Sequence, residues 1–397
     1  NFLKVGVIFF AFYLLFAGYY FKRIYQPWGT CDTDFTVFTR AAERIAQKKD
    51  VYQASYLETG VDFYKYSPSF AVFMIPLSKL HKHLSVPIWY FSIFAFFIAS
   101  IFFTKKILIA QNKEKVLSKT FYFFAILMSL RFLLSVIQRV QSDCLVLFFL
   151  ALFIYALYRE KQALAGLSLA TALMVKLTPL IFLPFLLLRK KIKAAGACVF
   201  FILFYAFVPA LYLGANKNLE YLKNWLLVHG KNPPGYITWY KNQSLLSSLM
   251  RFLTGDSEVS LLNLEPAKVY VIFIILAAAL FSLIFILRRK IRIEASGLSY
   301  LTEVSLVLIC MILLSPLAWK HTFVHLIIPH LVLLYYVLYK NPADKVTRAL
   351  LISSFFFNTI LNPELTGPFS KTVQLYSSVT AGTLILYVAL LRISYRQ

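Results

Sequence analysis

The sequence predicts an all-α polytopic membrane protein, a bundle of about 12 full or partial transmembrane helices with further helices in its outer loops. Of the 397 residues, 60% are hydrophobic, and the mean hydropathy is +0.70. Apolar runs near the length of a bilayer span recur along the chain, and short basic clusters separate them. The net charge of +24 is therefore interpreted as membrane topology, with nucleic-acid binding a poor second interpretation.

The basic clusters predict the topology, because short loops rich in Lys and Arg stay on the cytoplasmic side of a membrane. With all of these clusters inside, both chain ends are expected to be cytoplasmic. The first apolar run lacks a small-residue cleavage site and is expected to be retained as an anchor. The predicted spans are 2–21, 84–104, 120–137, 143–158, 194–214, 267–287, 299–315, 322–339, 348–361 and 372–391.

The apolar run 163–188 does not fit this pattern. Both of its ends lie beside basic clusters, so both are expected inside, yet the run is too short for two crossings of about 20 residues each. It is predicted to form two short helices that meet at Lys176-Leu177-Thr178-Pro179. Irregular backbone at membrane depth is tolerated only against protein or water, so this break predicts a cavity open to the outer side.

Two long loops, residues 22–67 and 215–266, are expected on the outer face of a single domain that comprises residues 1–397. Residues 68–80 are expected to form a short outer helix, and FTVFTRAAERIAQ an amphipathic one. The segment LLSSLMRFL is expected to lie on the membrane surface, with Arg251 off its apolar face.

The stretch CDTDF places Asp32 and Asp34 at the expected outer edge of the first span, in a chain that is poor in acids. A carboxylate near an apolar boundary can have its pKa raised by desolvation, which brings it towards the range useful to a general base. The alternative is a solvated pair that binds backbone donors ahead of the next helix. The pattern by itself leaves both interpretations open.

Two cations lie inside apolar runs, where a charge is costly. Lys176, at the predicted helix break, is expected to bind an anion, and the alternative is a side chain that reaches the interface. Arg131 is expected either to pair with an acid, of which Asp143 is one candidate, or to serve the substrate.

The segment SPLAWKHTF ends a Pro-interrupted helix at the predicted outer boundary. Trp319 is expected to be an interfacial anchor, whereas Lys320 and His321 are candidates to donate hydrogen bonds to a phosphate. The four cysteines have no ligand spacing, so neither a disulfide nor a metal site is expected. Gly-rich phosphate loops, HExxH and GxSxG are absent.

Six segments, taken in order, resemble glycosyltransferase family 87. Members of this family are GT-C-type helical bundles that use polyprenyl-phosphate sugars, and they include the bacterial phosphatidylinositol-mannoside mannosyltransferases. The segments are TDFTVFTRAAERI with VYQ (33–53), YKYSPSFAVFMIPL (64–77), QRVQSDCLVLFFLAL (138–152), KLTPLIFLPFLLLRKK (176–191), NQSLLSSLMR (242–251) and SPLAWKH (315–321).

The resemblance implies roles for individual residues. Asp34 matches the family's proposed catalytic base, and His321 matches a histidine near the lipid phosphate. Further candidates for contacts with the donor phosphate or the substrate are Lys320, Lys176, Asp32, Gln141, Arg131, Gln243 and Arg251. The chain departs from the family at Val140 and Asp143, where the family usually has Gly and Asn, and at Ser67, where it tends to have Pro.

The implied reaction is an inverting transfer of a hexose, mannose foremost, from a polyprenyl-phosphate donor to a hydroxyl of a lipid-linked or glycan acceptor. It is expected at the periplasmic or exterior face of the bacterial cytoplasmic (inner) membrane, without a cofactor or nucleic acid. One carboxylate base is sufficient if Lys and His donors receive the charge of the leaving phosphate.

A transporter or flippase of an anionic lipid or lipid-linked sugar is the alternative function. It predicts corresponding broken helices in two halves of the chain, whereas the sequence contains one clear break. A purely structural scaffold would leave Lys176 and the outer-loop acids unexplained.

Overall fold

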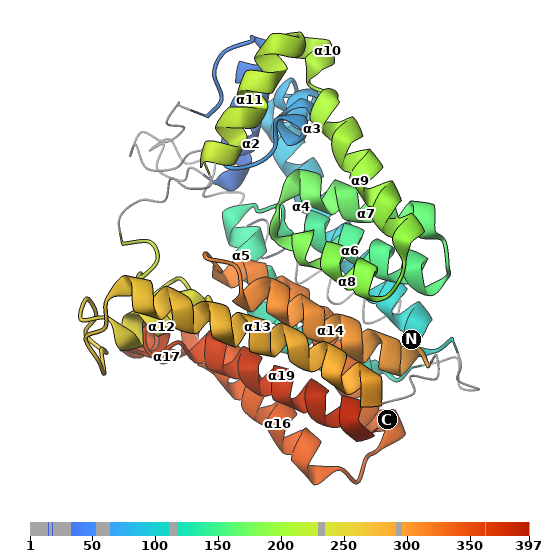
Figure 1. Ribbon diagram of the computed structural model, residues 1–397, viewed down its shortest axis with the longest axis vertical. Coiled ribbons are helices and arrows are strands. Elements are labelled where there is room, and N and C mark those ends of the chain that lie inside the picture. The colour runs from blue at the N-terminus through green and yellow to red at the C-terminus, as the bar shows by residue number, and fades with distance from the viewer. Residues whose placement is uncertain are drawn as a thin grey trace. The chain divides into compact units, whose positions relative to one another are not determined.

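The computed structural model describes residues 33–52, 64–110, 117–228, 235–290, 296–361 and 363–396, together with Leu15 and Gly18. Within these ranges the chain forms helices and no strand, which confirms the all-α prediction (Figure 1). The expected first span, 2–21, and Asp32 lie outside the described residues apart from Leu15 and Gly18.

Six helical stretches in the described part of the chain are long and apolar enough to cross a membrane. They are α4 (Lys82–Leu108), α5 (Lys119–Arg139), Ile192–Leu213, residues 266–286 of α13 (Pro266–Lys290), Lys320–Lys340 and α19 (Ser378–Arg396). Shorter apolar helices accompany them, as the prediction of full and partial spans requires.

Two compact units make up the chain. The N-terminal unit contains Gly6–Ser100 and Val136–Pro233, and the C-terminal unit contains Asn1–Val5, Ile101–Ser135 and Pro234–Gln397. Every candidate residue that the structure describes falls within one unit or the other. Asp34, Gln141 and Lys176 belong to the N-terminal unit, and the others belong to the C-terminal unit.

In the N-terminal unit, α7 packs against α6 and α9 through small residues. A Cβ atom added at Gly166 would lie only 2.5 Å from Ala197 Cβ and 2.7 Å from Ala194 O, so the α7 and α9 backbones approach closely there. The unit contains α2 (Asp34–Ala46), α3 (Pro68–Ser78), the first part of α4, α6 (Asp143–Tyr158), α7 (Gln162–Val175), η1 (Thr178–Ile181), α8 (Phe182–Leu188), α9 (Ile192–Phe207), α10 (Ala210–Leu213) and α11 (Ala215–Val228).

The predicted break in the run 163–188 is confirmed. Helix α7 ends at Val175, Lys176 has an extended backbone, and the 3-10 helix η1 starts at Thr178 before α8 begins. Pro179 lacks an amide hydrogen and disfavours a helical residue before it, so the run cannot continue as one regular helix.

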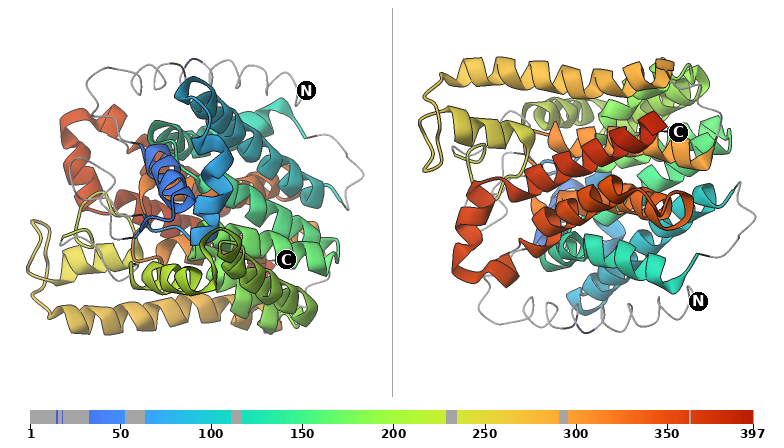
Figure 2. Two further views of the ribbon diagram at one scale, coloured as in Figure 1. Left: turned by 90° about the horizontal axis from the view of Figure 1, so that it is seen from above. Right: turned by 90° about the horizontal axis from the view of Figure 1, so that it is seen from below.

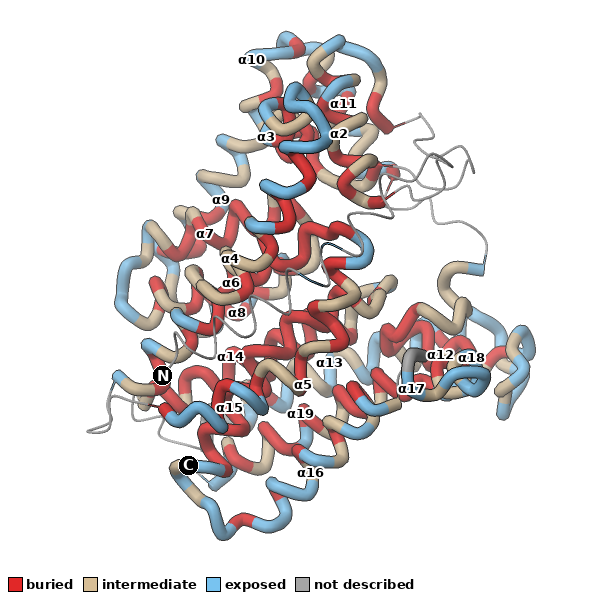
Figure 3. Tube along the Cα trace, turned by 180° about the vertical axis from the view of Figure 1, so that it is seen from behind, coloured by how far each residue is buried: buried red, intermediate tan, exposed pale blue. Residues whose placement is uncertain are grey.

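In the C-terminal unit, α14 and α15 carry most of the core, since nearly all of their residues are buried (Figure 3). Helices α16 and α19 lie side by side (Figure 2). The unit contains the end of α4, most of α5, α12 (Leu245–Leu253), α13, α14 (Gly297–Leu313), η2 (Lys320–Leu326), α15 (Ile327–Tyr335), η3 (Tyr336–Lys340), α16 (Lys345–Phe355), η4 (Phe356–Ile360), α17 (Pro363–Thr366), η5 (Gly367–Phe369), α18 (Ser370–Leu375) and α19.

Two sequence expectations in this unit are wrong. The span expected at 372–391 begins only at Ser378, after Ser377 adopts a left-handed φ of 57°. Helix α12 does form, but it does not lie on the surface, because Arg251 and most of its other residues are buried. Arg251 explains both differences, since it donates hydrogen bonds to Leu375 O and Ser377 Oγ and so ties α12 to the turn before α19.

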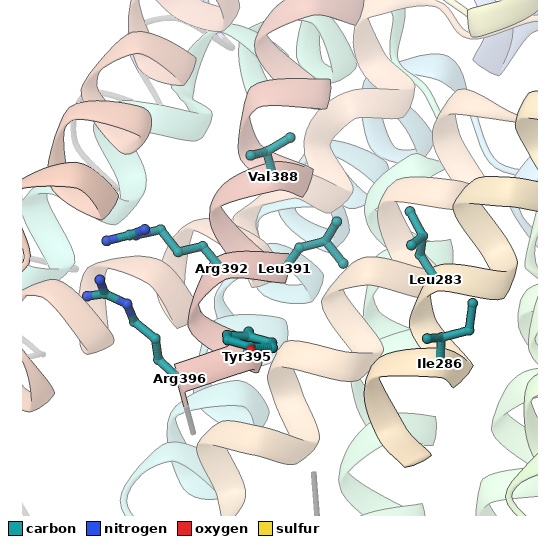
Figure 4. A pocket seen from close by; sticks show the side chains of 7 residues that line it. All are labelled: Leu283, Ile286, Val388, Leu391, Arg392, Tyr395 and Arg396. Atoms are coloured by element: carbon teal, nitrogen blue, oxygen red, sulfur yellow. The ribbon is translucent and has the colours of Figure 1, made fainter. Parts of the chain in front are cut away.

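Asp344 connects α16 to the end of α19. Its carboxylate caps α16 by accepting from Thr347 N at 3.2 Å, and it also accepts from Arg392 at 3.3 Å and Arg396 at 2.9 Å. The two guanidinium groups lie on the side of α19 away from Leu283 and Ile286, which line an apolar groove with Val388, Leu391 and Tyr395 (Figure 4). Asp344 therefore binds the guanidinium groups of Arg392 and Arg396, whose side chains also line this groove.

We expect Asp344→Asn to destabilise the protein at neutral pH by about 2 kcal/mol, through loss of charge-assisted hydrogen bonds. Burial raises the pKa of Asp344, but hydrogen bonds from Thr347 and Arg392 and the charge of Arg392 outweigh it and hold the pKa at about 2. An unfolded Asp titrates near pH 4, so this stabilisation is complete above about pH 5 and is lost as the pH falls towards 2. Thermal unfolding from pH 7 to pH 3 tests this, because a constant difference between variant and wild type would contradict it.

Candidate functional site

Asp34 is the first residue of α2, which an aromatic core holds in place. The helix buries Phe35 and Phe38. The Phe35 ring lies 5.6 Å from the ring of Trp89, and the Phe38 ring lies 4.7 Å from that of Tyr66. Asp34 thus starts a helix whose first two turns pack into this aromatic core.

Tyr66 lies among the candidate residues of the N-terminal unit, and the sequence analysis did not single it out. Its carbonyl oxygen accepts from Tyr52 Oη at 3.0 Å, and its own hydroxyl donates to Gln141 Oε1 at 3.1 Å. Burial raises the pKa of Tyr66 well above its usual value, and the negative charges of Asp34 and Asp143 raise it further. The hydroxyl is therefore a protonated hydrogen-bond donor that experiences both carboxylates. The sequence signal that could have identified Tyr66 is its place in the YKYSP segment, which is part of the family resemblance.

Gln141 and Asp143 belong to the turn between α5 and α6. Val140 takes a left-handed φ of 54°, which is costly for a β-branched residue and is the conformation that a Gly adopts freely. Gln141 Oε1 also accepts from Ser142 N at 2.9 Å, which fixes the amide beneath Tyr66. Asp143 starts α6 and is fully buried.

Lys176 forms an ion pair with Asp143. The distance from Lys176 Nζ to Asp143 Oδ2 is 2.7 Å, and the Lys side chain is 18% exposed while the Asp side chain is fully buried. The helix break places the Lys176 backbone beside α6, so the ammonium reaches the carboxylate across 33 residues of sequence. Lys176 thus pairs with a carboxylate of the protein, and an anion that bound Lys176 would compete with Asp143.

In the C-terminal unit, Lys320 and His321 occupy the first turn of η2, directly after the loop 314–319. His321 is 8% exposed, and Lys320 is partly exposed. The loop is attached to the segment before α12, because Asn242 Nδ2 donates to Pro316 O at 3.1 Å and Asn242 Oδ1 accepts from Ala318 N at 3.0 Å. A buried Asn therefore anchors the loop that precedes both Lys320 and His321.

The Asn242 side chain is fully buried, and both ends of its amide are bonded. Its neighbour Gln243 is buried too. Gln243 Nε2 donates to Tyr240 O at 2.7 Å and to Gln374 O at 2.8 Å, and its Oε1 accepts from Val379 N at 3.3 Å. The Gln243 side chain therefore connects the segment before α12 to the turn before α19.

Arg251 is a fully buried cation whose described partners are protein groups. Its Nη1 donates to Trp239 O at 3.0 Å and to Asn242 O at 2.8 Å, in addition to its bonds to the turn before α19. Burial lowers the pKa of Arg251 to about 10, so it stays charged at neutral pH. These contacts favour a supporting role over direct contact with a substrate.

Arg131 lies on α5 and is 7% exposed. Its Nη1 donates to Asn358 O at 2.7 Å and to Leu361 O at 3.1 Å. Asn358 belongs to the π-helical turn η4, whose geometry diverts carbonyl groups from the regular helical pattern. Arg131 therefore satisfies carbonyl groups at the end of α16, and its predicted contact with substrate stays a prediction.

Comparison with known families assigns the chain. The model of glycosyltransferase family 87 matches residues 63–316, which is more than half of the chain and includes Tyr66, Gln141 and Lys176. Asp34 and His321 lie outside the matched range. No curated protein matches the chain. The family match, together with the apolar helices, shows that the chain belongs to glycosyltransferase family 87 and is a multi-pass membrane glycosyltransferase.

Proposed function

We propose that the protein transfers a hexose, mannose foremost, from a polyprenyl-phosphate donor to a hydroxyl of a lipid-linked or glycan acceptor. The reaction takes place at the periplasmic or exterior face of the bacterial inner membrane. Within the chain, the support is the position of Asp34 at the start of α2, a helix that packs against Tyr66 through Phe38. The family match favours transfer over the alternative of a lipid transporter.

Asp34 acts as the general base. It takes the proton of the acceptor hydroxyl, whose oxygen attacks C1 of the sugar, and the bond from C1 to the phosphate oxygen breaks with its electrons on the phosphate. The configuration at C1 inverts because the displacement is a single step. Lys320 and His321 stabilise the phosphate, which can leave without a general acid.

The remaining polar residues of the N-terminal unit hold the base region together. Tyr66 is a positioning residue, since it joins the surroundings of Asp34 to Gln141 through its hydroxyl. Asp143 and Lys176 form a nearly neutral pair, so an anion would have to compete with Asp143 for the ammonium. Asp32, which precedes α2 by two residues, either tunes Asp34 through like-charge repulsion or binds a sugar hydroxyl.

Purified protein incubated with a panel of polyprenyl-phosphate sugars tests this function. Sugar release that depends on an added acceptor, is greatest with mannose and is absent in Asp34→Asn supports it. Preference for another hexose would correct the sugar alone. Movement of the intact lipid-linked sugar across proteoliposomes, without release, would contradict the proposal in favour of a flippase.

We expect Tyr66→Phe to lower turnover about tenfold, which corresponds to the free energy of one hydrogen bond, while the donor KM stays the same. The ring packing is preserved, so the unfolding temperature should change little. Tyr64→Phe is the matched control, because its buried hydroxyl donates to Ser67 O at 3.0 Å and contacts no candidate residue through that bond. Equal turnover losses in the two variants would show that the effect of Tyr66 is only structural.

A further inference from the structure

A cluster of aromatic side chains lies directly before Lys320 and His321. We name Tyr236, Trp239, Tyr240 and Trp319 the aromatic platform. All four residues are partly exposed. Tyr236 and Trp239 stack with ring centroids 5.5 Å apart and planes 29° apart. Trp319 stands at 88° to Tyr236 and at 74° to Trp239, at 5.7 Å and 5.5 Å. The rings thus form a corner between two nearly perpendicular planes.

One polar donor lies against these rings, and two more follow Trp319 in the sequence. The Lys241 ammonium lies 4.7 Å from the centroid of the Trp239 ring and 5.7 Å from that of Tyr240. Lys320 and His321 directly follow Trp319 in sequence. Apolar ring faces beside a few placed donors are the usual composition of a site for a small polar ligand.

Buried side chains bind the backbone beneath the aromatic platform. Arg251 binds the carbonyl oxygen of Trp239, and Asn242 binds the loop that carries Trp319 as well as Tyr236 O, at 3.3 Å. Both of these supporting side chains are fully buried. A membrane anchor needs aromatic rings at the interface but no fixed angle between them, whereas a binding site requires supported geometry. The buried network therefore favours binding.

We propose that the aromatic platform binds a hexopyranose ring. This inference rests on the proposed function, the transfer of a hexose. A pyranose has an apolar face of C–H groups that packs on an aromatic ring, and a rim of hydroxyls that needs hydrogen-bond partners. The corner provides two aromatic planes for the apolar face, and Lys241 provides a hydrogen-bond donor for the hydroxyls. The sugar comes either from the donor, where it is joined to the phosphate that Lys320 and His321 receive, or from the acceptor.

Binding measurements with three probes test this inference on the purified full chain. The probes are a short-chain polyprenyl-phosphate mannose, the same polyprenyl phosphate without sugar, and octyl mannoside. We expect Trp319→Ala to weaken binding of the mannose-bearing donor at least tenfold and to leave binding of the sugar-free phosphate unchanged, because only the sugar contact is lost. Trp319→Phe, which keeps a ring, should recover most of the affinity.

Tyr376→Ala is the matched control, since Tyr376 is a 60% exposed aromatic residue of the same unit outside the platform. A loss confined to octyl mannoside in Trp319→Ala would assign the platform to the acceptor sugar. Unchanged binding of both sugar probes would overturn the inference and leave the rings as interfacial anchors. If neither polyprenyl compound binds the wild type, the proposed donor is wrong, and octyl mannoside alone decides the inference.

Discussion

Asp34→Asn is expected to reduce sugar transfer by about 10²- to 10⁴-fold, the usual contribution of a general base. The amide keeps the size and most hydrogen bonds of the carboxylate, and it removes only the capacity to take a proton. Affinity for the donor should stay near the wild-type value, because the role proposed for Asp34 concerns the acceptor hydroxyl. Donor binding and single-turnover transfer, measured on the same preparation, separate the two effects.

Two further variants make this result specific. Glu43→Gln removes an exposed acid from the same helix, α2, and should transfer at the wild-type rate. Asp32→Asn should be milder than Asp34→Asn, through the lost neighbouring charge. A wild-type rate in Asp34→Asn would refute the assignment, and an inactive Asp32→Asn beside an active Asp34→Asn would exchange the two roles.

Lys176→Met is expected to destabilise the protein by about 3 kcal/mol, because it leaves the fully buried Asp143 carboxylate without the ammonium at 2.7 Å. The value lies at the lower end for a broken buried pair, since Lys176 is 18% exposed and water reaches one side of it. The double variant Lys176→Met/Asp143→Asn removes both charges and should recover most of the loss. Thermal unfolding in detergent of the wild type and of both variants measures these differences in stability.

The same double variant tests the predicted contact between Lys176 and the donor phosphate. A stable double variant that has lost donor affinity would support that contact, because stability and binding are then separated. Normal donor binding would restrict Lys176 to pairing with Asp143. No recovery of stability in the double variant would show that the ion pair is not what makes Lys176→Met unstable.

Local chemistry made much of the helical fold predictable. Apolar length identified the long helices, and the missing amide hydrogen of Pro179 placed the break after Lys176. The position of Asp34 at the start of α2 could also be predicted, because the polar stretch ends where a helical pattern begins. The start of α19 could not be predicted, since it depends on Arg251, which lies more than 120 residues earlier in the sequence.

The partners of charged residues depend on contacts that sequence periodicity does not contain. Arg251 was expected off the apolar face because an isolated cation is costly to bury, yet carbonyl and hydroxyl groups from distant segments satisfy it in the interior. Tyr66 looked like one aromatic residue among many, and only its bond to Gln141 distinguishes it. The aromatic platform likewise requires two loops about 80 residues apart to meet.

The sequence by itself determined the membrane class, most helices and the helix break, because hydrophobic length and proline geometry act over a few neighbouring residues. The candidate base Asp34 was named through the family resemblance and stays a prediction. The tertiary structure alone decided that Lys176 pairs with Asp143, that Arg251 and Gln243 are buried supports, and that Trp319 joins a corner of rings. These outcomes depend on which distant groups can satisfy a buried charge or amide, and packing decides that.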